Sequence, residues 1–256
     1  MNDKFGRTTL KLRNAIRQLH RASVRTEQQE FLVEGPHACL EMLKAGLRPR
    51  ILILTDEATP EVRSVADLAL HAGVDVRTAS TKDVELMCST RSSQGILMVM
   101  PTFRENVCRG RVVALDAVAD PGNVGTIIRT AAWFGCTDVV VSDDCADVYN
   151  PKVVRSSAGA LASVNIIRRH RVTDFLDEQP NLPVIVADAH AGINPKAATK
   201  PEQWCLVIGS EAHGVSEAVM VRANIRLTIQ GSKNVVESLN AAVAAAVLLY
   251  ELTDMP

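Results

Sequence analysis

The chain has 256 residues, of which 47% are hydrophobic and 22% charged, and its formal net charge is −1. A chain of this length forms one large domain or two ordinary ones, and its near-neutral charge argues against binding to nucleic acid mainly through bulk charge. It has no apolar run of the eighteen or so residues that span a membrane, no apolar signal-peptide core and no Cys-x-x-Cys pair among its six cysteines. We therefore expect a reduced, cytoplasmic protein with neither a metal nor a membrane partner.

The first predicted element is a basic helix over residues 8–26. Seven of the first 25 residues are Lys or Arg and one is acidic. Within the helix, arginines recur at every fourth position and so share one face: Arg13, Arg17, Arg21 and Arg25. This stripe is either a solvated helix face or a ridge that follows the phosphates of an RNA.

From residue 30 to residue 100, short apolar runs alternate with helix-like segments. Strands are predicted at 31–33, 51–54, 74–77 and 95–99, and helices at 37–46, 60–71 and 81–88. This alternation predicts a compact α/β unit. The pattern breaks at Pro101–Asn106. We accordingly place a first domain at 1–102, a linker at 103–110 and a second domain at 111–256.

The second domain repeats the alternation up to its end. Strands are predicted at 112–118, 138–142, 164–167, 184–188, 205–209 and 225–229, and helices at 124–134, 151–161, 172–179, 216–222 and 238–252. Apolar strands alternating with helices predict a parallel sheet that is covered on both faces. Ligands of such sheets bind beyond the carboxyl ends of the strands. The loops after residues 118, 188, 209 and 229 are therefore the places to look for a site.

The loop that precedes the helix at 124–134 is rich in glycine, but it matches neither the dinucleotide-binding nor the phosphate-loop fingerprint. This absence counts against a nucleotide-dependent oxidoreductase. Asn123 is placed to cap the helix. Arg129 interrupts an otherwise apolar helix, and because arginine is rarely buried unpaired, we expect it to point into a cleft or to meet a carboxylate.

The loop after residue 209 contains two glycines, Gly209 and Gly214, that would let the backbone approach a ligand closely. Glu211 lies between them, at the carboxyl end of a strand, where it could hold Arg129 or accept a hydrogen bond from a ligand. Ser216 is typical of a helix cap. His213 receives no role, since a histidine in a loop is more often a surface residue.

The C-terminal stretch places polar side chains directly before an apolar helix. Glu237, Ser238 and Asn240 precede a run of Ala, Val and Leu over residues 241–252. A helix with so few charges has to be covered nearly all round. One polar residue is enough to cap it, so these three are either a cap with its neighbours or part of a site at the mouth of the helix.

Three of these segments, in this order, resemble the SpoU (TrmH-type) ribose methyltransferases of the SPOUT superfamily. They are PGNVGTIIRTAAWFG, IGSEAHGVS and VESLNAAVAAAVLLYE, and DCADVYNPKVVRSSAGAL also matches that family. The resemblance covers residues 107–253. The phrase FLVEGPHACLEML is similar to the small ribosomal-protein-like α/β RNA-binding domain that often precedes this catalytic domain.

The resemblance implies an S-adenosylmethionine-dependent 2′-O-ribose methyltransferase that acts on structured RNA. Its fold would be α/β, with a mostly parallel sheet, helices on both faces and a deep C-terminal trefoil knot. The leading target is 23S ribosomal RNA, with guanosine as the modified nucleotide. One alternative is a transfer RNA 2′-O-methyltransferase of the same family, and the other is a non-catalytic RNA-binding or ribosome-assembly protein on the same fold. Relatives form homodimers through the knot region, so a homodimer is expected.

The family's functional residues fall on named positions of this chain. The catalytic set would be Asn123, Arg129, Glu211, Ser238 and Asn240. Contacts with the cofactor would come from Ala187, Gly209, Gly214, Ile229 and Leu239. Arg129 acts either as a base or as a clamp on the phosphate beside the target ribose, and its guanidinium is a poor base. The family usually has Ile-Pro after the sixth strand, whereas this chain has Ile229-Gln230 and a longer loop up to Asn234.

Overall fold

The computed structural model describes residues 5–90, 92–232 and 238–253, and the chain divides into two compact units. One unit combines the chain up to Phe103 with the segment Tyr149–Ala162. The other combines Arg104–Val148 with the chain from Ser163 onwards. The first unit therefore includes a segment that the sequence pattern groups with the second domain.

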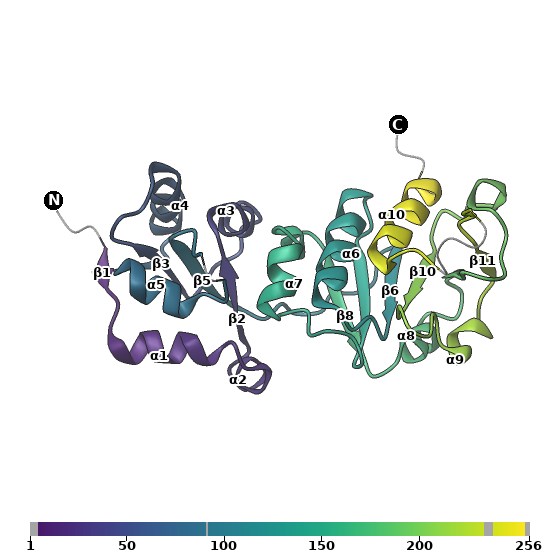
Figure 1. Ribbon diagram of the computed structural model, residues 1–256, viewed down its shortest axis with the longest axis horizontal. Helices are drawn as coiled ribbons and strands as arrows, with labels where there is room; N and C mark the ends of the chain where they lie inside the picture. The colour runs from purple at the N-terminus through teal and green to yellow at the C-terminus, as the bar shows by residue number, and fades with distance from the viewer. Residues whose placement is uncertain (1–4, 91, 233–237, 254–256) are drawn as a thin grey trace. The chain divides into compact units, whose positions relative to one another are not determined.

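The first unit contains a mixed sheet whose strand order is β1-β4-β3-β5-β2 (Figure 1). Its strands are β1 (Gly6–Arg7), β2 (Glu30–Glu34), β3 (Ile51–Thr55), β4 (Asp75–Ala79) and β5 (Ile96–Pro101). β5 is antiparallel to both of its neighbours, and the other pairs are parallel. The helices α3 (Pro36–Lys44), α4 (Pro60–His71) and α5 (Thr81–Met87) alternate with the strands, as the sequence predicts. The two-residue strand β1 was not predicted.

The prediction of one helix over residues 8–26 is wrong. The chain forms α1 (Leu10–Gln18) and α2 (Ala22–Gln28), with a turn between them. The buried guanidinium of Arg25 donates hydrogen bonds to the carbonyl oxygens of Leu19 and His20, at 2.9 and 3.0 Å. These carbonyls, at the end of α1, are therefore satisfied by a side chain instead of by a continuing helix.

The segment Tyr149–Ala162 packs on β2 through α7 (Pro151–Ser156) and an aromatic cluster. The ring of Phe31 lies 4.7 Å from that of Tyr149 and 5.4 Å from that of Phe103. The helix predicted at 151–161 ends early, because Ala158 and Gly159 have positive φ angles of 50° and 90°. The short 3-10 helix η1 (Ala160–Ala162) follows.

The second unit contains a parallel sheet of strand order β11-β9-β10-β6-β7-β8, which confirms the predicted α/β class. Its strands are β6 (Val112–Asp116), β7 (Asp138–Ser142), β8 (Asn165–Arg169), β9 (Val184–Ala187), β10 (Cys205–Gly209) and β11 (Ile225–Leu227). All residues of β6 and β7 are buried. The continuous apolar runs arise because both faces of the sheet are covered.

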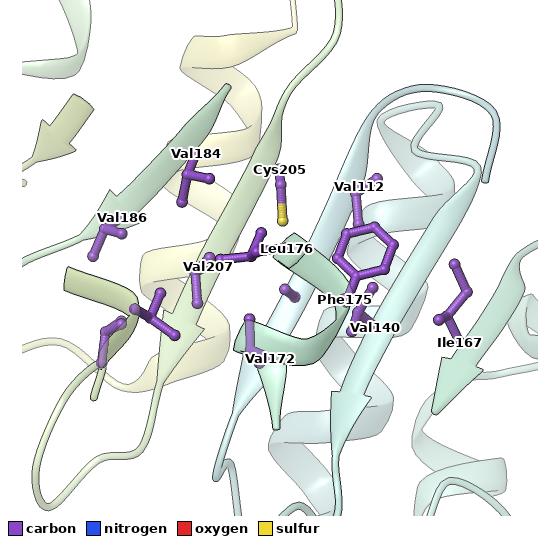
Figure 2. Close-up of a cluster of buried hydrophobic side chains, with 13 residues drawn as sticks. Val112, Val140, Ile167, Val172, Phe175, Leu176, Val184, Val186, Cys205 and Val207 are labelled. Carbon is purple, nitrogen blue, oxygen red and sulfur yellow. The ribbon is translucent and has the colours of Figure 1, made fainter. Parts of the chain in front are cut away.

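Helices cover the two faces of this sheet in pairs. On one face, α8 (Val172–Glu178) and α9 (Glu217–Met220) pack on a cluster that includes Phe175 and Val207 (Figure 2). The helices α6 (Pro121–Trp133) and α10 (Ala241–Leu252) pack against one another on the opposite face (Figure 1). A 3-10 helix, η2 (Pro195–Ala197), lies between β9 and β10.

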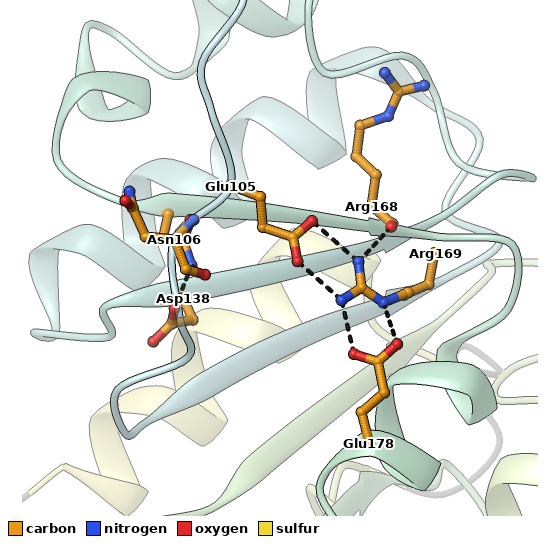
Figure 3. A network of polar contacts seen from close by, with 7 residues as sticks. Glu105, Asn106, Asp138, Arg168, Arg169 and Glu178 are labelled. Atoms are coloured by element: carbon orange, nitrogen blue, oxygen red, sulfur yellow. Dashed lines mark hydrogen bonds and ion pairs between the residues drawn. The ribbon is translucent and has the colours of Figure 1, made fainter.

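The segment 103–110 has neither helix nor strand, and polar contacts hold part of it against the second unit (Figure 3). Arg169 donates to the carboxylates of Glu105 and Glu178, at 2.7 to 3.0 Å. The side chain of Asn165 bonds the backbone of Asn106 through both its oxygen and its nitrogen, at 2.8 and 2.9 Å. Residues 105 and 106 thus have fixed positions relative to the sheet.

Candidate active site

The carboxyl ends of β6 and β10 are neighbours at the point where the strand order reverses. After β6 the chain passes through α6 to β7 on one side, and after β10 it passes through α9 to β11 on the other. Connections that diverge in this way leave a crevice at the edge of a parallel sheet. This is the place where the sequence pattern locates a site.

A chain of hydrogen bonds joins three of the predicted residues at this crevice. The Nδ2 group of Asn240 donates to Oδ1 of Asn123 at 3.1 Å. The Nδ2 group of Asn123 in turn donates to Oε1 of Glu211. The three residues come from segments that are 88 and 117 positions apart in sequence. We refer to Asn240, Asn123 and Glu211 as the amide relay.

The direction of the amide relay is fixed by α10. The backbone N–H groups of Ala242 and Val243 donate to Oδ1 of Asn240, at 3.0 and 3.3 Å, so Asn240 is the N-cap of α10. The oxygen of Asn240 is therefore occupied, and its NH₂ group faces Asn123. Because Oδ1 of Asn123 accepts from Asn240, the NH₂ group of Asn123 faces Glu211, whose carboxylate can only accept a hydrogen bond.

The expectation that Asn123 caps α6 is wrong. Asp120 is the N-cap, because its Oδ1 accepts from the N–H of Asn123 at 2.9 Å, and Pro121 occupies the first helical position. The side chain of Asn123 is consequently free to join the amide relay.

The loop after β10 is a tight turn that both glycines make possible. The backbone groups of Ser210 and Gly214 exchange hydrogen bonds at 2.9 and 3.0 Å, and Gly214 has a φ of +69°. A Cβ atom on Gly209 would lie 2.1 Å from the carbonyl carbon of Gly214. Gly209 thus makes room for the backbone of its own loop, and not only for a ligand as we expected. Ser216 is the N-cap residue of α9, but its side chain makes no capping hydrogen bond.

A cavity of about 320 Å³ lies at the same edge of the sheet. Its lining includes all five residues expected to contact a cofactor: Ala187, Gly209, Gly214, Ile229 and Leu239. Glu211 and Ser238 also line it. Asp188 and His190 line the cavity as well. Neither was predicted as a site residue, although the loop after residue 188 was expected to contribute to the site.

Of the two positions expected for Arg129, the structure does not show the one in which it meets a carboxylate. Its side chain is exposed on α6, and it forms no hydrogen bond or ion pair with any residue that the structure describes. Glu211 does not hold it, because that carboxylate accepts from Asn123. Arg129 is therefore a cation at the surface that is available to a partner. Glu237 and Asn234 lie outside the described residues.

The four N-terminal arginines do not form one ridge. Arg13 is paired with Asp83, and Arg25 is buried. Arg17 and Arg21 remain exposed, at the end of α1 and at the N-cap of α2.

Burial disfavours the thiolate form of the cysteines. Burial is the main cause of a raised pKa at each thiol: Cys39, Cys88, Cys108, Cys136, Cys145 and Cys205. For Cys88 the pKa rises to about 11 and for Cys136 to about 12.

In residues 5–90, 92–232 and 238–253, no three His, Cys, Asp or Glu side chains group in a way that could hold a metal ion. Within the same ranges, no helix combines the length and the apolar character that crossing a membrane requires.

Comparison with known proteins assigns both parts of the chain. The model of the SpoU rRNA Methylase family matches residues 110–250, and that of an MRM3-like substrate binding domain matches residues 14–98. The 23S rRNA (guanosine(2553)-2′-O)-methyltransferase RlmP of Bacillus subtilis is 32% identical over 240 residues, which cover 92% of this chain and 93% of the relative.

Two solved structures have the same fold over almost the whole chain. A protein from Porphyromonas gingivalis that is assigned to the TrmH family of RNA methyltransferases is 35% identical, with a TM-score of 0.83 over 96% of this chain and 98% of that one. An AdoMet-bound rRNA methyltransferase from Sinorhizobium meliloti has a TM-score of 0.84 at 24% identity, over 96% and 95% of the two chains. Because the family model spans more than half of the sequence and the Bacillus relative aligns over nearly all of it, the chain belongs to the SpoU rRNA methylase family.

Proposed function

We propose that the protein transfers a methyl group from S-adenosylmethionine to a ribose 2′-hydroxyl of 23S ribosomal RNA, with guanosine as the target nucleotide. The observation that carries this proposal is the amide relay, which brings three distant segments together beside a cavity of cofactor size. Membership of the SpoU family and the guanosine-specific Bacillus relative support the reaction and the target.

The cavity suits S-adenosylmethionine in size and in charge. Small-molecule sites begin at about 300 Å³, and this cavity has about 320 Å³. It combines apolar side chains such as Leu227 and Leu248 with the carboxylates of Asp188 and Glu211. No lysine or arginine is present among the described residues that line it. When bound, the cofactor supplies a methyl group on a positively charged sulfur atom.

Some residues of the chain bind the cofactor or the target nucleotide, and others position the loops that carry them. The backbone at Gly209, Ile229 and Leu239 holds the donor, and Ala187 and Gly214 complete the wall. The amide relay keeps the loop after β10 in register with the start of α10, so donor and acceptor meet in one geometry. Ser238 and Asn240 bind the target nucleotide at the mouth of α10, where the helix dipole favours an anion.

Arg129 binds the phosphate beside the target ribose and stabilises the developing alkoxide. Because a guanidinium is a poor base, we assign Arg129 the role of a phosphate clamp and not that of the base. The exposure of its side chain and the lack of a partner among the described residues favour a role toward RNA.

We also propose a homodimer through α6 and α10, with a trefoil knot formed by the C-terminal chain. Three large apolar side chains on these helices are exposed: Trp133 by 77%, Val243 by 50% and Tyr250 by 69%. Val243 and Tyr250 lie seven positions apart, on one face of α10. Sedimentation as a monomer at micromolar concentration would refute the dimer.

The N-terminal domain, residues 1–102, binds the RNA substrate and is joined through the linker at 103–110 to the catalytic domain at 111–256. The substrate-binding family model over residues 14–98 supports this division. Arg17 and Arg21 supply phosphate contacts, because their side chains are exposed. We also place the enzyme in the cytoplasm, together with its ribosomal RNA substrate.

The test is a methyl-transfer assay with purified protein, labelled S-adenosylmethionine and, in separate reactions, 23S ribosomal RNA and total transfer RNA. Digestion to nucleosides should yield labelled 2′-O-methylguanosine from the ribosomal RNA. Label in transfer RNA alone would move the substrate to the alternative within the family. Calorimetric binding of S-adenosylmethionine without any transfer would leave an RNA-binding protein, and failure to bind it would refute the proposal.

A further inference from the structure

Among the residues that the structure describes, the cavity beside the amide relay is lined by two acidic side chains and by no lysine or arginine. Asp188 and Glu211 contribute carboxylates from the loops after β9 and β10, and the remaining titratable side chains in its described lining are His190 and His213. The described lining thus holds two carboxylates and no permanently cationic side chain. A cavity of this kind favours a ligand that brings a positive charge.

The two carboxylates differ in what they already bind. Glu211 accepts from Asn123 and so belongs to the amide relay. The Oδ1 atom of Asp188 accepts from the backbone N–H groups of His190 and Ala191, at 2.8 and 3.1 Å. No hydrogen bond to its Oδ2 atom comes from the part of the chain that the structure describes.

Asp188 is also held firmly in place. Its backbone N–H donates to the carbonyl oxygen of Leu227 at 3.0 Å, which ties the end of β9 to β11. The residue is half-buried. Its carboxylate therefore has a fixed position, partial shielding from water and one oxygen that is available to a ligand. Such a charge is screened less than one on an open surface.

We infer that Asp188 is a specificity-determining residue that makes the cavity prefer the cationic methyl donor over the neutral product. This inference rests on the proposed function. In the reaction, the carbon–sulfur bond of the donor breaks and the carbon–oxygen bond to the ribose forms. The sulfur keeps the bonding electron pair and becomes a neutral thioether, while the hydroxyl proton passes to solvent. The donor therefore has one more positive charge than S-adenosylhomocysteine, and a fixed carboxylate attracts only the donor through that charge.

The consequence is that binding and release are coupled to the chemistry. Before transfer, the attraction to Asp188 adds to the affinity that the backbone at Gly209, Ile229 and Leu239 provides. After transfer, that attraction is gone while the other contacts remain, so the product leaves more readily than the donor. The enzyme should accordingly bind S-adenosylhomocysteine more weakly than S-adenosylmethionine.

The experiment measures the affinities of the full chain for S-adenosylmethionine and for S-adenosylhomocysteine by calorimetry. Asp188→Asn removes the charge and keeps an oxygen that can accept from His190 and Ala191. We expect it to weaken donor binding about tenfold (~1.4 kcal/mol) and to change product binding by less than about twofold. Asp188→Glu should restore much of the preference. Asp144→Asn is the matched control, because Asp144 is exposed in the loop after β7 and does not line the cavity.

Each outcome bears on the inference. If Asp188→Asn lowers the affinities for both ligands equally, Asp188 is a structural residue and the inference is overturned. If it lowers neither affinity, the inference is overturned as well. If the wild-type chain binds neither ligand, the proposed function is itself wrong. Binding of both ligands to the wild type with no preference in any variant would overturn this inference alone.

Discussion

Replacing Asn123 with aspartate tests whether the amide relay holds the site together. Asn123→Asp changes the shape of the side chain very little, and the new carboxylate can still accept from Nδ2 of Asn240. It can no longer donate to Glu211, and it places a second negative charge against that carboxylate. The substitution thus isolates one contact of the amide relay.

The expected cost follows from two contributions. A hydrogen bond to a charged group contributes roughly 1.5–3 kcal/mol. Two like charges about 4 Å apart repel by about 1 kcal/mol in water and by about 4 kcal/mol at an effective dielectric constant of 20. Because Glu211 is exposed, the lower end of both ranges applies. We expect a loss of about 2 kcal/mol, which corresponds to a fall in the unfolding midpoint of roughly 5 °C.

The assay is thermal unfolding between about pH 4 and pH 8, together with calorimetric binding of S-adenosylmethionine. Repulsion raises the pKa of one of the two carboxylates above its unfolded value, so the penalty grows as the pH rises through that pKa. Below that pKa one carboxyl group is protonated and can donate to the other, so the difference in stability from wild type should narrow. Asn194→Asp is the control, because that side chain caps η2 through its oxygen alone. If Asn123→Asp matches wild type in stability and affinity at pH 7, the amide relay does not organise the site.

Three further experiments test the other parts of the proposed mechanism and fold. Arg129→Ala should abolish methyl transfer while keeping the affinity for S-adenosylmethionine within about tenfold (~1.4 kcal/mol); turnover close to normal would remove Arg129 from the mechanism. Arg17→Glu and Arg21→Glu, each made singly, should weaken RNA binding and flatten its salt dependence. Arg48→Glu, a single charge reversal at an exposed site elsewhere in the first unit, should have a smaller effect; salt slopes equal to that of Arg48→Glu would make Arg17 and Arg21 part of a solvated face. Hydrogen bonds from Arg169 hold the pKa of Glu178 below its usual range, so their stabilisation is present at neutral pH and is lost as the pH falls through the folded pKa. Because Glu178 is largely solvent-exposed, Arg169→Ala should cost only about 1 kcal/mol, or roughly 3 °C in the unfolding midpoint at pH 7; a difference that persists unchanged below pH 4 would contradict this linkage.

The sheet of the second unit could be predicted because the sequences of its strands are continuous apolar runs. Burial on both faces leaves β6 and β7 no polar alternation, so their order along the chain and their class follow from the sequence. The cap of α6 could have been predicted too. Pro121 marks the first turn of the helix, which makes Asp120 the N-cap and frees Asn123.

Other features depend on contacts between distant segments, and no local pattern encodes them. The break between α1 and α2 arises where the side chain of Arg25 satisfies the carbonyl groups at the end of α1, although helical periodicity continues through the break. The packing of α7 on β2 depends on three aromatic rings that are far apart in sequence. Asp188 could not be predicted as a site residue, because a single acidic residue after a strand belongs to no motif. Its position in the lining of the cavity is seen only in the structure.

The most direct test of the central claim is a map of ribose methylation in the RNA of a strain that lacks this protein. We predict that one 2′-O-methylguanosine of 23S ribosomal RNA disappears, that the wild-type gene restores it and that the Arg129→Ala variant does not. An unchanged methylation map in the deletion strain, or full restoration by Arg129→Ala, would contradict the account.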